Sequence, residues 1–117
     1  MSTISTHVLD TSLGQPAAGV PVRLERVWAD HAAEGTQVLG SGQTDGDGRL
    51  RELLPPGGAL EPGTYRIVFG SGAYFAARGV EGFYPEVTVL FRVAAAGEHY
   101  HVPLLLSPFG YSTYRGS

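Results

Sequence analysis

Hydrophobic and polar residues alternate along much of this chain with the period of two that is typical of β-strands. In the first such stretch, Ile4, Thr6 and Val8 alternate with Ser5 and His7. Glycine and proline lie between the alternating stretches, which indicates turns between short strands. We therefore expect strands at residues 4–10, 20–28, 36–44, 64–70, 86–93 and 99–107, with shorter ones beginning near residue 50 and covering 110–114.

One stretch lacks this alternation. Residues 71–79 are rich in alanine and are expected to form a short helix, with Ser71 as a candidate N-cap and Gly79 at its end. Seven or eight short strands with one short helix predict a mainly β fold, an antiparallel β-sandwich. The chain of 117 residues has the usual size of one domain, so we expect residues 1–117 to form a single domain.

Glycines and a turn sequence refine this pattern. Gly40 and Gly42 are expected to weaken the third strand and keep it short. The segment DGDG at residues 45–48 consists of two turn-forming dipeptides, and it should reverse the chain just before Arg49.

Composition narrows the classes of function. The chain carries 11 acidic residues against 8 lysines and arginines and has no basic run, which argues against nucleic-acid binding through phosphate contacts. No apolar stretch is long enough to span a membrane, and no secretory signal is recognisable. The absence of cysteine removes disulfides, thiolate nucleophiles and cysteine-based zinc sites. We expect a cytoplasmic protein, with peroxisomal delivery left open.

Histidines are the clearest candidates for chemistry. In HYHVPLLL, a strand would place Tyr100 on the apolar face, and His99 and His101 together on the other. His7 also faces away from the apolar residues of its own strand. Two interpretations fit, a solvated outer face or a shared histidine site. A metal site is disfavoured because the nearest acidic residue, Glu98, faces the opposite side.

The same two interpretations, a solvated surface and a built site, apply to the last residues, YSTYRGS at 111–117. Terminal segments usually fray, yet Tyr114 and Arg115 are bulky side chains to leave in a solvated tail. A surface position is the simpler interpretation of Arg49 and Arg115 when each is considered alone. The pattern by itself leaves both an ordinary tail and a built site open.

Taken together, the segments THVLDTSLGQPAAGVPVRLER, TDGDGR, FYPE and EHYHVPLLLSPFGYSTYRGS resemble the transthyretin-related family whose members hydrolyse 5-hydroxyisourate, the product of urate oxidation. The resemblance covers residues 6–117, and YRGS is its most specific element. Hydrolases of this family share a first-strand histidine, an arginine after the Asp-Gly turn, the second histidine of HYH and YRGS, and the carriers of the family replace them. This sequence has the hydrolase residues at these places, namely His7, Arg49, His101, Tyr114, Arg115, Gly116 and Ser117.

The resemblance implies a transthyretin-like sandwich that assembles as a homotetramer, with active sites in a central channel and neither a metal nor an organic cofactor. It implies hydrolysis of 5-hydroxyisourate to 2-oxo-4-hydroxy-4-carboxy-5-ureidoimidazoline in urate degradation. His7 and His101 would jointly activate water, and Arg49 would bind the substrate and stabilise the developing oxyanion. Hydrogen bonds from Tyr114 and Ser117 would complete the site, with Ser117 in the catalytic set, and Arg115 and Gly116 would hold the tail in its pose.

A carrier is the alternative within the same family. Such a protein would bind a small aromatic ligand in the channel of the tetramer without turnover. Its channel should be mostly apolar, whereas this sequence would place two imidazoles and a guanidinium in each site.

Overall fold

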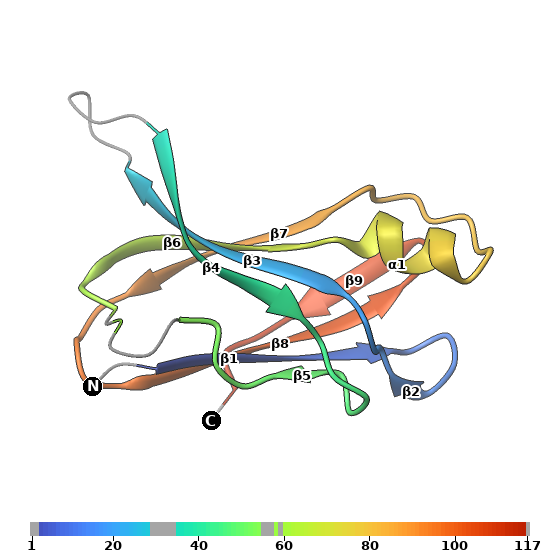
Figure 1. Ribbon diagram of the computed structural model, residues 1–117, viewed down its shortest axis with the longest axis horizontal. Coiled ribbons are helices and arrows are strands. Elements are labelled where there is room, and N and C mark those ends of the chain that lie inside the picture. The colour runs from blue at the N-terminus through green and yellow to red at the C-terminus, as the bar shows by residue number, and fades with distance from the viewer. Residues whose placement is uncertain (1–2, 29–34, 55–57, 59, 117) are drawn as a thin grey trace.

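Two β-sheets packed face to face form the protein (Figure 1). The computed structural model describes residues 3–28, 35–54, 58 and 60–116. One sheet has the strand order β2 (Gln15–Pro16), β1 (Thr3–Asp10), β8 (His99–Ser107) and β9 (Gly110–Thr113), with β5 (Arg49–Leu50) also paired to β1. The other has the order β4 (Gly35–Gln43), β3 (Pro21–Trp28), β6 (Gly63–Phe69) and β7 (Val87–Val93), and α1 (Ser71–Ala77) follows β6.

The inward-facing side chains of the alternating strands fill the space between the two sheets. On β1 the inward residues Ile4 and Val8 are almost completely buried, and on β8 Leu104 and Leu106 are buried as well. The second sheet contributes apolar residues from β3, β6 and β7 to the same core. Outward neighbours on β1 and β8 stay partly or fully exposed, Pro103 excepted. The mainly β sandwich fold with one short helix is therefore confirmed.

One strand pair has a direction that the pattern does not reveal. β1 and β8 are parallel and in register from Thr3 opposite His99 to Asp10 opposite Leu106, whereas every other described pair is antiparallel. Alternation is the same in parallel and antiparallel strands, so sequence could predict the faces of these strands but not their relative direction. The buried hydroxyl of Thr6 reinforces the pair by donating to the carbonyl of Val102 at 2.6 Å.

Three expectations about elements need correction. The first concerns Gly40 and Gly42, which do not shorten the third strand: β4 covers Gly35–Gln43, close to the expected 36–44. The expected weakening is seen as a shift of register against β3 beside Gly40. A Cβ at Gly40 would collide with the carbonyl oxygen of Leu53, so this glycine serves packing and does not end the strand. The helix is capped by Gly70 and not by Ser71, whose hydroxyl instead donates to the carbonyl of Tyr84 at 3.0 Å.

The third correction is a two-residue strand, β2, within a segment expected to be only a turn. The end of the helix was predicted correctly, since Gly79 follows the last turn with a positive φ of 71°.

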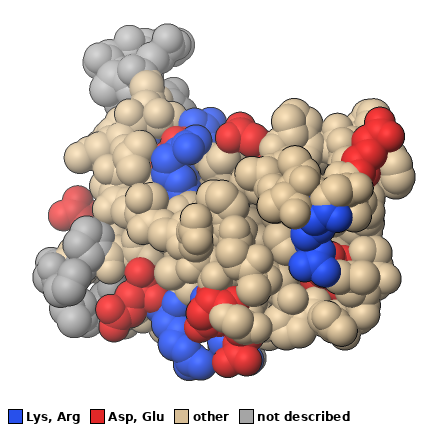
Figure 2. All heavy atoms as spheres, turned by 45° about the vertical axis from the view of Figure 1, so that its right-hand side comes forward, with Lys and Arg blue, Asp and Glu red and all other residues tan. Residues whose placement is uncertain are grey.

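Charged residues do not gather into one large patch on the face that Figure 2 shows, where arginine and acidic side chains are scattered over a mostly uncharged surface. Within the described ranges, no helix has the length and apolar character needed to cross a membrane.

Candidate active site

Strand register brings three of the predicted site residues to the outer face of the β2-β1-β8-β9 sheet. His101 on β8 pairs with Ser5 on β1, and His7 lies two residues further along β1 on the same face. His7 in turn pairs with Arg49 on β5. Because paired residues project to the same side of a sheet, His7, Arg49 and His101 form one row of half-buried side chains across three strands.

A tight turn fixes Arg49 beside His7. The carboxylate of Asp45 accepts hydrogen bonds from the backbone N–H groups of Asp47 at 2.9 Å and Arg49 at 3.0 Å. These bonds, first that from Arg49, hold the pKa of the Asp45 carboxyl below its ordinary value. Gly48 has a φ of 76°, and a Cβ there would collide with the carbonyl of Val8. The carbonyl of Gly48 accepts from the Val8 N–H at 2.7 Å, which ties the turn to β1.

The same turn orients His7. Its Nε2 donates to the backbone carbonyl of Asp47 at 2.9 Å. Because a carbonyl oxygen can only accept, the proton of the neutral ring lies on Nε2, and Nδ1 keeps its lone pair. The Asp-Gly turn predicted from sequence thus positions both a guanidinium and an imidazole.

His101 has a different environment. Its Nδ1 is hydrogen-bonded to Ser5 Oγ at 2.8 Å, and its ring stacks on that of His99 with centroids 6.5 Å apart. Burial, followed by the nearby charges of His99, His7 and Arg49, lowers the pKa of His101 below its ordinary 6.5. The ring is therefore neutral at physiological pH, and within the described part of the chain its Nε2 has no hydrogen-bond partner.

A hollow of about 320 Å³ lies beside Arg49 and His101, two of the three residues of this row, a volume at the lower end of small-molecule sites. Its lining is basic, and no acidic side chain contributes to it among the residues described. The lining residues are Ser5, Thr6, Arg49, Arg51, His99 and His101.

The C-terminal tail after β9 lies against β8, the strand that carries His101. The N–H of Gly116 donates to the carbonyl of His101 at 2.8 Å, and the two residues form an isolated antiparallel bridge. A Cβ at Gly116 would lie 2.5 Å from Cδ2 of His101 and 3.3 Å from Cγ of Pro103. The tail is thus part of the structure, and Gly116 is needed for close contact with the imidazole.

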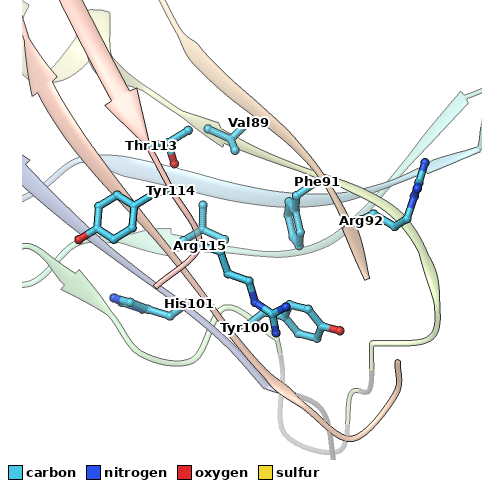
Figure 3. A pocket seen from close by; sticks show the side chains of 9 residues that line it. Val89, Phe91, Arg92, Tyr100, His101, Thr113, Tyr114 and Arg115 are labelled. Carbon is cyan, nitrogen blue, oxygen red and sulfur yellow. The ribbon is translucent and has the colours of Figure 1, made fainter. Parts of the chain in front are cut away.

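Alternating residues of the tail point to opposite sides of β8 (Figure 3). Tyr114 extends to the side of His101, whereas Arg115 extends to the other side, toward Tyr100. The guanidinium of Arg115 lies 4.7 Å above the Tyr100 ring and 3.2 Å from the carboxylate of Glu98. Arg115 therefore holds the tail in this single chain from the side of β8 opposite His101.

The structure thus brings His7, Arg49 and His101 to one face of the sheet. It places Tyr114, which is 57% exposed, on the same side as His101. Ser117 lies outside the described residues. Sequence reasoning missed Ser5 and Arg51. The period of two places Ser5 on the same face as His7, and this was the signal that could have found it.

Chemically, this arrangement combines two imidazoles, of which that of His101 is neutral at physiological pH, with a pair of guanidinium groups. An imidazole can take a proton from water, and the guanidinium groups can bind and stabilise an anionic oxygen. No group of three or more histidine, cysteine or acidic residues suited to holding a metal occurs in the described ranges.

Comparison with known proteins gives consistent results. The model of the HIUase/Transthyretin family matches residues 4–116. A 5-hydroxyisourate hydrolase of Salmonella dublin is 47% identical over 114 residues, covering 97% of this chain and 80% of that protein. The structure of Klebsiella pneumoniae 5-hydroxyisourate hydrolase matches all of both chains with a TM-score of 0.85 and 38% identity. Sea bream transthyretin in complex with thyroxine matches with a TM-score of 0.87 and 30% identity, covering 97% of this chain and 94% of that one.

Proposed function

The chain belongs to the HIUase/Transthyretin family and is an enzyme of the 5-hydroxyisourate hydrolase type, and we propose that the outer-face row of His7, Arg49 and His101 is its catalytic site. The observation that carries the proposal is that strand register brings these three residues from β1, β5 and β8 to one face of the sheet. Two of them, Arg49 and His101, line the basic hollow on that face.

His101 is the proposed general base. The lowered pKa keeps its ring neutral, and its free Nε2 can accept a proton from the attacking water. The water oxygen bonds to the amide carbonyl carbon of 5-hydroxyisourate. The C–N bond of the ring then breaks, and the imidazolium returns the proton to the leaving nitrogen. His7, with its proton fixed on Nε2, keeps Nδ1 available to orient the water or the substrate.

Arg49 is proposed to bind the substrate and to stabilise the oxyanion that forms on the attacked carbonyl. A guanidinium provides fixed paired donors for such an oxygen, and the turn at Asp45 holds its backbone in place. The product would be 2-oxo-4-hydroxy-4-carboxy-5-ureidoimidazoline, whose new carboxylate also suits a basic site.

The tail is proposed to complete the site. Tyr114 would donate a hydrogen bond to the substrate, and Ser117 would add a hydroxyl from beyond the last described residue. Gly116 and Arg115 would set the position of both, the first by its contact with His101 and the second by its contact with Tyr100.

We further propose that residues 1–117 act as one domain and assemble as a homotetramer around a channel that contains these sites. The support is exposed apolar surface at the turn between β8 and β9, where Phe109 is 69% exposed. The cytoplasm is the proposed compartment, because the sequence contains no cysteine.

A carrier function is the alternative, and a transthyretin in complex with thyroxine is among the structural relatives. The basic lining of the hollow argues against it, since a carrier site for an aromatic ligand should be mostly apolar.

The test is to generate 5-hydroxyisourate in place with urate oxidase and follow its ultraviolet absorbance with and without the protein. We expect the decay to accelerate in proportion to protein concentration. Decay at the buffer rate at micromolar protein, combined with thyroxine binding by calorimetry, would favour the carrier.

A further inference from the structure

A chain of hydrogen bonds runs along the outer face behind His101. Ser5 Oγ is hydrogen-bonded to Nδ1 of His101 at 2.8 Å and to Nε2 of His99 at 3.1 Å. The remaining nitrogen of His99, Nδ1, is hydrogen-bonded to the hydroxyl of Thr3. Register explains the row, because β1 and β8 pair Thr3 with His99 and Ser5 with His101. The chain thus leads from the half-buried imidazole to an exposed one.

When both rings are neutral and the Ser5 hydroxyl donates to one of them, the protons in this chain can be arranged in two directions. In one direction, His101 donates from Nδ1 to Ser5, and Ser5 donates to Nε2 of His99. His99 then carries its proton on Nδ1 and donates to Thr3. In the opposite direction every bond is reversed, and the proton of His101 lies on Nε2. Only the first direction leaves Nε2 of His101 with a lone pair.

We propose that Ser5 and His99 are positioning residues that hold His101 in the Nδ1–H tautomer, so that Nε2 is free to accept a proton from water. This inference rests on the proposed function. Neither residue needs to touch the substrate, since both act through the ring of His101.

Several observations fit the electrically neutral, well-held His101 ring that this proposal requires. The two rings are nearly parallel, at 16°, with centroids 6.5 Å apart, so protonating both would place two positive charges close together. Arg49 on β5, Arg51 after it and His7 on β1 add further positive or protonatable groups around the same hollow. These neighbours favour the neutral form of His101, which can take part in a continuous chain through Nδ1. The opposite edge of the His101 ring is fixed by Gly116, so the imidazole is held on both sides.

The kinetic test compares variants along the chain. Ser5→Ala should lower kcat by about 10–100-fold, the range typical of residues that orient a functional group, with KM changed less than about twofold. Ser5→Thr keeps the hydroxyl and should recover most of the rate. His99→Phe keeps the ring but removes both nitrogens, and it should lower kcat in the same way. Thr88→Ala, which removes an exposed hydroxyl from β7 on the other sheet, is the matched control.

The second test needs no substrate. In protein labelled with ¹⁵N-histidine, NMR of the wild type should show His101 protonated at Nδ1 and unprotonated at Nε2, and Ser5→Ala should shift the ring toward the Nε2–H form. Unchanged kcat in folded Ser5→Ala, or a wild-type His101 protonated at Nε2, would overturn the inference. An inactive wild type would overturn the proposed function instead. The NMR measurement of the His101 tautomer would then still test the direction of the hydrogen-bond chain.

Discussion

At the scale of single residues, the two histidines of the site differ because the groups behind them differ. His7 is held by a backbone carbonyl, which can only accept a hydrogen bond. His101 is held by a hydroxyl, which can donate or accept a hydrogen bond. His101 is also placed among other positive groups and shielded from water. This combination makes His101 the better candidate for a base, although both rings lie in the same row.

The pH dependence of the reaction should reflect this environment. Because the pKa of His101 is below 6.5 in the folded protein, kcat/KM should be flat near neutrality and fall only at a pH below 6.5. The unfolded chain takes up this proton near 6.5 and the folded chain resists it, so the free energy of unfolding should also decrease as pH falls through this range. Rate and NMR titrations check both statements. An acidic limb centred above 6.5 would contradict the assignment.

Gly116 gives a second prediction at this scale. Gly116→Ala places a methyl group 2.5 Å from the His101 ring, which must then move. Displacements approaching 1 Å can cost about 10²-fold in rate, so we expect a loss of at least about tenfold with normal circular dichroism. Gly110→Ala is the matched control, because its added Cβ would be 3.7 Å from the nearest atom, Ser107 Oγ. Equal rates for the two variants would show that the tail does not position His101.

At the scale of elements, the turn between β4 and β5 and the parallel pair β1 and β8 create the site. The first was predictable, because Asp-Gly dipeptides define turns locally. The faces of His7 and His101 were also predictable from alternation. Their proximity was not, because it depends on the parallel pairing of strands 96 residues apart and on its exact register. The bridge between Gly116 and His101 was missed for the same reason, since it forms beyond the last alternating residue.

The turn can be tested separately from the site. Asp45→Ala removes the acceptor of the Arg49 N–H, and it should raise KM and lower kcat/KM by about tenfold, since the guanidinium would be less well positioned. Asp47→Ala removes the same charge two residues away but keeps the backbone carbonyl that holds His7. It should therefore remain close to wild type. Equal losses in the two variants would indicate that charge, and not the turn, matters.

At the scale of the whole molecule, aromatic residues exposed on β9 and in the turn before it suggest assembly. Pro103, which the sequence placed with the outward apolar residues, is buried within the single chain, where Thr113 bonds its carbonyl and Gly116 lies beside its ring. It therefore does not add to the exposed patch. Phe109 and Tyr111 do, at 69% and 41% exposed. A basic hollow open on one side also leaves room for a facing subunit to complete it.

Light scattering should accordingly give a mass four times that of one chain at working concentration. The reason is that burying exposed aromatic side chains against a second copy stabilises the assembly by removing apolar surface from water. A monomeric mass with full activity would contradict both the tetramer and a site shared between subunits.

The most direct measurement of the central claim is the rate at which His101→Asn hydrolyses freshly generated 5-hydroxyisourate, compared with wild type at equal protein concentration. Asparagine cannot take up a proton, and His101 lies on the side of β8 away from the core, so the fold should persist. The account predicts a loss of about 10²–10⁴-fold in turnover, the usual contribution of a general base, with unchanged circular dichroism and mass. A folded variant that hydrolyses the substrate at nearly the wild-type rate would show that the histidine row on the outer face does not carry the reaction.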